Sequence, residues 1–375
     1  MLARDPGAIG PERNSEDWAR PRLTAIGSCP ICRACDSRIF FHSPDLLHGV
    51  PGEFIYRRCS SCRTVFQDPR VVAEDIPLCY PGTYYTHATC DMGGGSGGDQ
   101  HISGRRFGWL RNRLREAIVG GMRQPRSGSW GFGAGRVLAC MRGFRERAFF
   151  GLLDELIPRQ AGAARALDVG CGAGRLMVAL GRVGWTVEGL ELDPVAAEVA
   201  RRTSGGRVTL GDLFTADIPD AAFDLVVLSH VFEHLTDPCA ALRRIAGLLT
   251  LSGTAVLIYP NPDGLGARLF RRRWAGWDPP RHLVIPPSQA LAVAARRNGL
   301  RPLKVRTASR SFGGFSWRVG SDSPLLPSSV PAGWSGKLLQ AISSGRFLKK
   351  ASALGRCLGI DGGEEIVVVL AKGGR

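Results

Sequence analysis

Three closely spaced glycines mark the stretch of this sequence whose residue types best suit ligand chemistry. They fall at positions 170, 172 and 174, directly after an apolar run that contains Asp168 and directly before an apolar helical pattern. This order predicts a buried strand, a tight turn and a helix. Glycine lets the backbone come close to a ligand, because a Cβ at these positions would block the approach. An ordinary strand–helix turn has the same pattern, so the neighbouring motifs must distinguish the two.

Polar side chains also stand at the ends of the next three predicted strands. Glu191 lies roughly 20 residues beyond the glycines, where a carboxylate can accept hydrogen bonds from ribose hydroxyls. Asp212 is placed to accept from an adenine amine, and Ser229 and His230 follow the fourth strand. The strands are expected at 186–192, 208–213 and 223–228. Polar residues at the carboxyl ends of successive strands match the rule for ligand sites on open parallel sheets.

Asp168 indicates the charge of the ligand. The spacing G-x-G-x-G differs from the dinucleotide fingerprint G-x-G-x-x-G, in which a pyrophosphate meets the helix N-terminus. A carboxylate at the strand end would repel a phosphate and suits a ligand that carries positive charge. S-adenosylmethionine, with its sulfonium and α-amino groups, meets this description.

These motifs together resemble a class I S-adenosylmethionine-dependent methyltransferase over about residues 145 to 375. The residues that carry the resemblance are the glycine motif after Asp168, Glu191 in E-L-D-P, Gly211-Asp212, and F-D-L-V-V-L-S-H-V-F-E-H. The resemblance implies an α/β fold with a Rossmann-like seven-stranded sheet in the order 3-2-1-4-5-7-6. The cofactor-binding residues that it implies are Asp168, Gly170, Cys171, Gly172, Gly174, Glu191, Leu192, Asp212, Leu213 and Ser229.

Four cysteines predict a separate metal site before this domain. Cys29-Pro-Ile-Cys32 and Cys59-Ser-Ser-Cys62 are two C-x-x-C units, each of which offers two thiolates from one turn, as in tetrahedral structural zinc sites. Short strands at 37–41 and 53–57 suggest a zinc ribbon, which is too small to fold without its metal. Cys35 is not expected to be a ligand. Methyltransferases that carry such a module are often associated with sugar or cell-surface polysaccharide pathways.

The chain divides into four parts on this reading. Residues 1–25 are expected to be disordered, 26–70 to form the ribbon, 71–144 to connect, and 145–375 to form the methyltransferase domain. The connector contains a glycine-rich linker at 92–98 and an arginine-rich segment at 101–145. Helices are expected at 107–118, 145–157, 176–183, 238–250, 288–299 and 337–358, and the remaining strands at 164–169, 253–259, 302–309 and 365–372.

The composition bounds the class of protein. The 375 residues exceed one ordinary domain, and a hydrophobic content of 44% provides for a sizeable core. The net charge of +16 suggests an anionic partner, such as nucleic acid, a nucleotide-linked substrate or a membrane surface, or else a generally arginine-rich surface. No signal peptide and no apolar run of membrane-spanning length is expected. The sequence therefore predicts a cytoplasmic protein with reduced cysteines.

Methyl transfer is an in-line displacement, in which the protein mainly aligns acceptor and methyl group. Its acceptor can also need a base, and the candidates are His230, Glu233, His234 and His282. On a helical turn the first three would share one face, which suits a divalent metal and resembles the E-x-x-E-H of some quinone-precursor O-methyltransferases. A base, a substrate contact, a metal ligand and a structural cap all remain open for this group. His282 lies in a proline-bounded loop expected to cover the acceptor.

The function predicted from these features is methylation, on oxygen, nitrogen or carbon, of a small polar or sugar-linked acceptor. Two other classes stay open: a nucleic-acid methyltransferase whose ribbon and basic surface hold RNA, and a non-catalytic scaffold with a methyltransferase fold. Nucleic acid is the less favoured partner. The basic helix at 337–358 is expected to pack on the sheet, and peripheral contact with an anionic membrane is the alternative. A monomer or weak dimer is expected.

Overall fold

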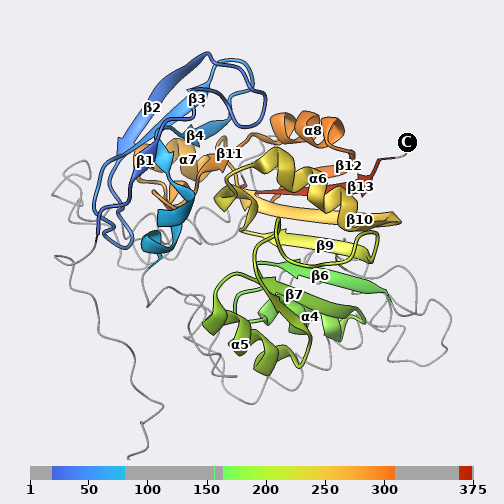
Figure 1. Ribbon diagram of the computed structural model, residues 1–375. Helices are drawn as coiled ribbons and strands as arrows, with labels where there is room; N and C mark the ends of the chain where they lie inside the picture. Colours follow the sequence, from blue (N-terminus) through green and yellow to red (C-terminus); the bar gives the residue numbers. More distant parts are fainter. Residues whose placement is uncertain (1–18, 81–155, 157–163, 309–362, 374–375) are drawn as a thin grey trace, which may run out of the picture.

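The computed structural model describes residues 19–80, 156, 164–308 and 363–373. A seven-stranded sheet lies at its centre, and the N-terminal strands lie beside one end of that sheet, as Figure 1 shows. The linker at 92–98, the arginine-rich segment at 101–145 and the helix expected at 337–358 fall outside the described residues. Among the described residues, no helix is long and apolar enough to cross a membrane.

The first half of the large sheet alternates strands and helices. Its elements are β6 (Arg165–Val169), α4 (Arg175–Arg182), β7 (Thr186–Glu191), α5 (Pro194–Ser204), β8 (Val208–Leu210), β9 (Phe223–Ser229) and α6 (Pro238–Leu248). All four strands pair in parallel, with β6 between β7 and β9. Parallel strands require crossover connections, and α4 supplies the one from β6 to β7 and α5 the one from β7 to β8. The polar ends of these strands therefore meet at one edge.

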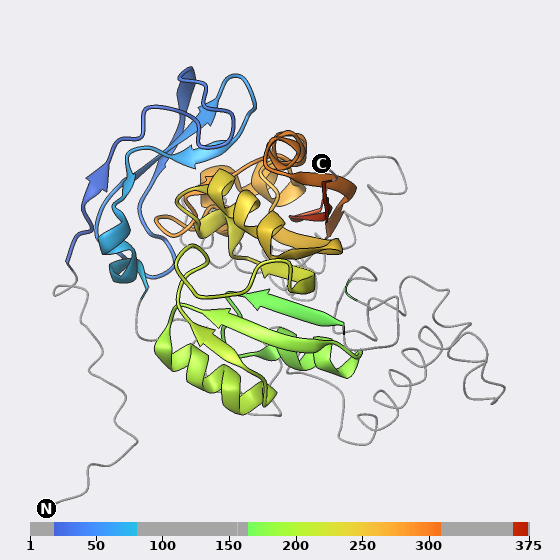
Figure 2. The ribbon, with the colours of Figure 1, turned by 45° about the vertical axis from the view of Figure 1, so that its right-hand side comes forward.

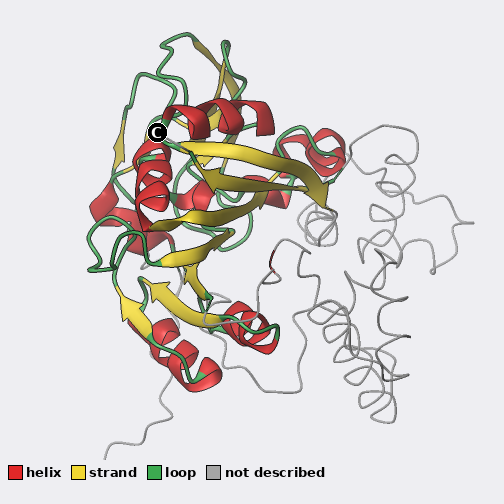
Figure 3. Cartoon of the chain, turned by 90° about the vertical axis from the view of Figure 1, so that its right-hand side faces the viewer, coloured by secondary structure: helices red, strands yellow, loops and turns green. Residues whose placement is uncertain are grey.

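The second half of the sheet ends in an antiparallel pair. It comprises β10 (Leu249–Pro260), α7 (Leu265–Phe270), α8 (Ser288–Arg297), β12 (Leu300–Ala308) and β13 (Glu365–Lys372). The strand order is β12-β13-β10-β9-β6-β7-β8. Counted along the chain within this sheet, that is 3-2-1-4-5-7-6 from β8 to β12. Figure 3 shows the sheet with its helices from the side.

Strand alternation divides the interior into two layers. Val226 and Leu228 of β9 join one apolar cluster with Leu242 of α6 and Leu291 of α8. Their neighbours Leu225 and Val227 join a second cluster on the other face, which contains Leu180 of α4. Because side chains point alternately to the two faces of a strand, a continuous apolar run fills both layers. The run Phe223–Leu228 is buried for this reason.

The N-terminal ribbon does not stand apart from the large domain. Its strands are β2 (Ser37–Ser43), β3 (Phe54–Cys59) and β4 (Val65–Gln67), and the sheet is completed by β11 (Val284–Ile285), which follows α7 along the chain. The order is β11-β4-β3-β2. Figure 2 shows the ribbon strands beside the elements that follow β10.

Two boundaries differ from the sequence-based expectations. A short strand β1 (Leu23–Thr24) pairs with β5 (Arg70–Val71), so regular structure begins before residue 26. The ribbon sheet also extends beyond residue 70, because β11 adds its backbone hydrogen bonds from a distant part of the chain. No local pattern in two apolar residues announces such a partner. The short 3-10 helix at Ala73–Cys79 then leads to the end of this described segment.

Candidate active site

The glycine turn between β6 and α4 has the backbone that only glycine adopts easily. The φ angles of Gly170, Gly172 and Gly174 are +65°, +52° and +77°. A Cβ on Gly170 would lie 2.5 Å from Cγ2 of Val231, so the loop after β9 packs directly on this turn. The glycine turn and the loop that carries Val231 are therefore in direct contact.

Asp168 is a buried carboxyl group beside the turn. Its side chain is 2% exposed, and Oδ2 has no hydrogen-bond partner among the described residues. Burial, with a smaller contribution from Glu191, raises the pKa of Asp168 to about 8. A buried polar atom without a partner is costly. A cationic group next to Asp168 would supply the missing interaction, so the site fits the sulfonium and amino groups of S-adenosylmethionine.

The side chain of Glu191 accepts a hydrogen bond from the backbone of the glycine turn. Oε2 accepts from the N–H of Gly172 at 2.7 Å, and Oε1 accepts from Leu192 and Asp193 at 2.9 and 3.1 Å. A carboxylate offers about four acceptor directions, and three are used here. Glu191 therefore holds the turn in place, and its predicted contact with a ribose stays a prediction.

Asp212 caps a tight turn after β8. Oδ1 accepts from the N–H groups of Phe214 and Thr215 at 2.6 and 3.0 Å, and Oδ2 accepts from the Thr215 hydroxyl at 2.6 Å. Burial opposes ionisation, but these hydrogen bonds outweigh it and lower the pKa of Asp212. β8 ends at Leu210, earlier than the sequence pattern indicates. The adenine contact of Asp212 is likewise untested.

The flanking residues of the predicted cofactor site differ in exposure. Cys171 and Leu213 are 7% and 3% exposed, whereas Leu192 is 63% exposed. Ser229 ends β9 and is half-buried. Figure 1 shows that the strands these residues follow lie next to one another in the sheet. The turn glycines, the acids and these neighbours all follow the carboxyl ends of β6, β7, β8 and β9.

His230 does not lie on a helical turn with Glu233 and His234, as the sequence suggested. It has a left-handed φ of +57° and lies before a 3-10 turn formed by Phe232–His234. Its Nδ1 is 3.3 Å from Glu233 and its Nε2 is 3.2 Å from Glu365. Burial favours the neutral ring, but the two glutamates outweigh it and raise the pKa of His230 to about 10. His230 is therefore an imidazolium at neutral pH, and the expected face of His230, Glu233 and His234 is not formed.

A different cluster unites Glu233, His234 and His282. One donor atom from each lies within 4.8 Å of the others. The rings of His234 and His282 meet edge to face, with centroids 4.6 Å apart. Burial and the nearby His282 lower the pKa of His234 to about 4, so this imidazole is neutral. The side chain of Glu233 is fully buried, and His230 outweighs the effect of burial and lowers its pKa.

The ribbon holds His282 in place. The Tyr56 hydroxyl donates to the carbonyl of His282 at 2.7 Å, and Arg281 binds Asp45 through two hydrogen bonds of 2.8 Å. Arg281 also binds Asp278 of its own loop, and the Arg281 and Asp45 side chains are fully buried. Sequence reasoning missed Asp45, Tyr56 and Arg281. Arg281 stands next to His282 in the sequence, but nothing local connects either residue to the ribbon.

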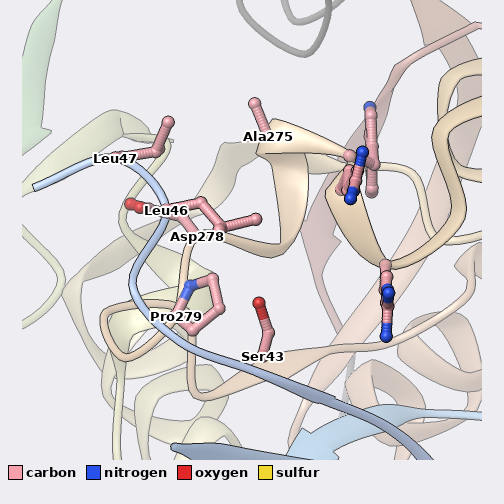
Figure 4. Close-up of a pocket in the computed structure, with 9 residues that line it drawn as sticks. Ser43, Leu46, Leu47, Ala275, Asp278 and Pro279 are labelled. Carbon is pink, nitrogen blue, oxygen red and sulfur yellow. The ribbon is translucent and has the colours of Figure 1, made fainter. Parts of the chain in front are cut away.

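A small pocket lies at the same junction. Figure 4 shows Ser43, Leu46 and Leu47 of the ribbon opposite Ala275, Asp278 and Pro279. Arg272, Arg273 and Trp274 complete its lining. None of the residues that line this pocket belongs to the glycine turn. The pocket shows that the two regions meet through side chains from both.

The four predicted zinc ligands lie together. One sulfur from each of Cys29, Cys32, Cys59 and Cys62 lies within 4.8 Å of the others, and the Cys29–Cys62 and Cys32–Cys59 separations are 3.6 and 3.5 Å. A tetrahedral zinc with Zn–S bonds of about 2.3 Å requires sulfur separations of about 3.8 Å. The thiols are thus compatible with zinc. Cys35 is exposed and does not belong to this group.

Residues 141–305 match a family model described as a methyltransferase domain. This part of the chain is similar to methyltransferase domains. An uncharacterized methyltransferase of Mycobacterium bovis is 36% identical over 116 residues, which are 30% of this chain and 58% of that protein. A ubiquinone biosynthesis O-methyltransferase of Xanthomonas campestris is 38% identical over 100 residues, which are 25% of this chain and 42% of that protein.

The matched region spans about half of each of these curated relatives. A solved S-adenosylmethionine-dependent methyltransferase from Mesorhizobium loti is 16% identical, with a TM-score of 0.40. The alignment covers 58% of this chain and 94% of that structure. The residues that match the family model include the glycine turn and the acidic residues at the ends of β7 and β8.

Proposed function

We propose that the chain is an S-adenosylmethionine-dependent methyltransferase that acts on a small polar or sugar-linked acceptor, in a reducing, cytoplasmic compartment. The observation that carries the proposal is the contact between the glycine turn and Val231. It sets the cationic-ligand site at Asp168 next to the loop that bears the buried Glu233 and His234. Methylation requires a methyl donor and can require a proton acceptor, and these two sites would supply them from adjoining segments.

Residues at three strand ends would each bind a different part of the cofactor. Asp168 and the three glycines take the methionine end, Glu191 the ribose and Asp212 the adenine, with Cys171, Leu192, Leu213 and Ser229 beside them. The cofactor supplies the methyl group as part of a sulfonium. The acidic side chains of Asp168 and Glu191 would lie near that cation and favour its binding electrostatically. The turn glycines allow the close approach that alignment requires.

The acceptor's proton would be taken by His282 or His234. His282 directs Nδ1 at the carbonyl of Gly276 at 2.9 Å, and His234 directs Nδ1 at the carbonyl of Arg281 at 3.0 Å. A carbonyl only accepts, so a hydrogen bond to it places a hydrogen on Nδ1, and Nε2 is the nitrogen that would take the acceptor's proton. The Tyr80 hydroxyl also lies 3.0 Å from Nδ1 of His234. His230, charged at neutral pH, serves instead to balance Glu233 and Glu365.

The ribbon would be held by one structural zinc ion on Cys29, Cys32, Cys59 and Cys62. Closed four-thiolate sites stabilise small folds and keep no position open for a substrate. β11 adds a strand to the ribbon sheet directly after His282. The zinc therefore supports the acceptor end of the active site without entering the chemistry.

Calorimetric titration with S-adenosylmethionine and with its demethylated product tests the cofactor site. Glu191→Ala should lose about 1–3 kcal/mol of binding free energy, because it removes the group that fixes the turn and accepts from the ligand. Glu198→Ala, an exposed change on α5, is the matched control. Unchanged affinity in both Glu191→Ala and Gly172→Val contradicts the assignment. Absence of binding in the parent chain would favour the non-catalytic scaffold.

Transfer of labelled methyl tests the acceptor class. The chain is incubated with labelled cofactor and either nucleotide sugars and small phenols or total RNA. Once an acceptor is found, His282→Ala and His234→Ala should bind cofactor normally while turnover falls roughly 10²- to 10⁴-fold. Parent rates in both variants mean that neither histidine is the base. Labelling of RNA alone would replace the small-molecule assignment.

A further inference from the structure

The Glu233, His234 and His282 side chains have the donor set and the arrangement of a metal site. They come from two segments, the turn after β9 and the loop before β11, and are brought together by a backbone bond from the N–H of Leu283 to the carbonyl of Glu233 at 2.7 Å. One donor from each lies within 4.8 Å of the others. The side chains of Glu233 and His282 are 0% and 6% exposed.

Each imidazole has a hydrogen-bond partner at Nδ1. Nδ1 of His234 lies 3.0 Å from both the carbonyl of Arg281 and the Tyr80 hydroxyl, and Nδ1 of His282 lies 2.9 Å from the carbonyl of Gly276. A hydrogen bond from Nδ1 to a carbonyl leaves Nε2 as the nitrogen that can bind a metal ion. His282 Nε2 lies 3.8 Å from Oε1 of Glu233, too far for a hydrogen bond and close enough for both to bind one ion. Metal-bound histidines typically donate their other ring N–H to a carbonyl or carboxylate in this way.

The carboxylate of Glu233 is fully buried between His230 and His282. Both of its oxygens are buried and have no hydrogen-bond partner among the described residues, although His230 and His282 lie within 4 Å of Oε1. His230 balances the charge of Glu233, and a metal ion bound to Glu233 would satisfy the lone pairs that remain without a hydrogen bond.

We propose that Glu233, His234 and His282 bind one divalent ion of the zinc class. Two imidazoles and one carboxylate suit Zn²⁺, Co²⁺ or Fe²⁺, whereas Mg²⁺ and Ca²⁺ prefer oxygen ligands throughout. Three protein ligands leave a coordination position open, as in catalytic zinc sites. The ion is thus distinct from the closed four-thiolate site of the ribbon.

The open position suits an oxygen of the methyl acceptor, a reading that rests on the proposed function. A bound divalent ion lowers the pKa of a coordinated hydroxyl, so its proton leaves to solvent. The acceptor oxygen then forms a bond to the methyl carbon as the carbon–sulfur bond of the cofactor breaks, and the electron pair stays on sulfur. With the ion in place His234 and His282 are ligands, and in its absence their Nε2 atoms remain free to accept the proton directly.

Metal content of the full chain tests the site without any acceptor. The protein is stripped with a chelator, dialysed against Co²⁺ alone or Zn²⁺ alone, and its bound metal is measured by mass spectrometry. The parent should hold two ions per chain. His282→Gln and His234→Gln should each hold one and weaken binding of the second Co²⁺ at least 100-fold. His42→Gln, a half-exposed histidine of the ribbon, should retain two.

The cobalt spectrum keeps the test decisive if a variant folds poorly. A four-thiolate site gives intense sulfur-to-cobalt bands, whereas a site of nitrogen and oxygen gives only weak visible bands, so the two ions are read separately in the parent protein. One ion per chain with thiolate bands alone overturns the proposal, as do two ions in His282→Gln. Cofactor titration is run on the same samples. Its failure would contradict the proposed function, while a second ion would still establish the site.

Discussion

The cofactor end and the acceptor end of the candidate active site are built in opposite ways. At the cofactor end, Glu191 binds Gly172 across 19 residues, and Asp212 binds residues two and three positions away. At the acceptor end, Arg281 binds Asp45 across 236 residues and Tyr56 binds His282 across 226. The first set forms within strand–turn–helix units, whereas the second exists only when the ribbon is docked.

The two ends of the site therefore depend on different parts of the molecule. The cofactor end draws on its own turn geometry and on the parallel sheet below it. The acceptor end draws on the ribbon, because β11 adds its pairing to β4 and because buried ribbon side chains hold the loop of Arg281 and His282. Changes to the ribbon should therefore damage acceptor chemistry and leave cofactor binding largely intact. The following predictions test that separation.

Removal of a zinc ligand should have the largest effect. Cys59→Ser should lose the ribbon metal and, with it, the support of His282, because structural zinc contributes on the order of 10 kcal/mol to small folds. Turnover should disappear while cofactor affinity stays within a few-fold of the parent. Metal analysis and calorimetry measure the two outcomes, with Cys35→Ser as the control that keeps its metal. Equal zinc in parent and Cys59→Ser would remove Cys59 from the ligand set.

Arg281→Met should come next. It leaves the buried carboxylates of Asp45 and Asp278 without their cation, and breaking such a buried pair costs about 3–5 kcal/mol of unfolding free energy. Arg202→Met removes an exposed pair with Glu198 and should cost much less, because solvent screens that pair. Chemical denaturation compares the two. Similar losses of unfolding free energy in the two variants would mean that the buried Arg281 pairs stabilise the protein no more than the exposed Arg202 pair.

The pH dependence of cofactor binding should be a smaller effect than the loss of stability in Arg281→Met. It should arise at the cofactor end of the site. The pKa of Asp168 is raised to about 8, so the carboxyl is mostly protonated at neutral pH. Its contribution to the stability of the free protein is present below the unfolded pKa near 4 and is lost as pH rises through 8. A cationic ligand favours the carboxylate, so binding should release up to one proton and tighten up to about tenfold per pH unit between 6 and 8.

Titration in two buffers of different ionisation enthalpy measures that proton. Asp168→Asn should bind without releasing it and show a flat profile over the same range. Proton release that persists in Asp168→Asn would assign the effect to another group. Ribbon variants should leave this pH profile unchanged, which separates the two ends again.

Tyr56→Phe should have the smallest effect. It removes one hydroxyl that donates to the carbonyl of His282, worth about 0.5–1.5 kcal/mol of unfolding free energy. Tyr259→Phe is the matched control, because that hydroxyl is buried with no hydrogen-bond partner among the described residues and its removal should be neutral or stabilising. Denaturation midpoints compare the variants. A larger loss in Tyr259→Phe would reverse the expected order.

The sequence by itself determined the features whose causes are local. Glycines at 170, 172 and 174 require a tight turn, apolar runs such as Phe223–Leu228 require buried strands, and two C-x-x-C units bring pairs of thiols together. Each is set by residues within one or two elements, so spacing and residue type predict it. The acids at the strand ends follow from the same reasoning, because parallel strands end at one edge.

Only the tertiary structure decided the acceptor end. The sequence placed His230 with Glu233 and His234 on one helical face, but a left-handed residue and a 3-10 turn direct His230 toward Glu365 and bring His282 to the other two. Asp45 and Arg281 are unremarkable in the sequence, and burial makes each necessary to the other. Contacts between segments more than 200 residues apart leave no local pattern, because their cause is the packing of the ribbon against the sheet.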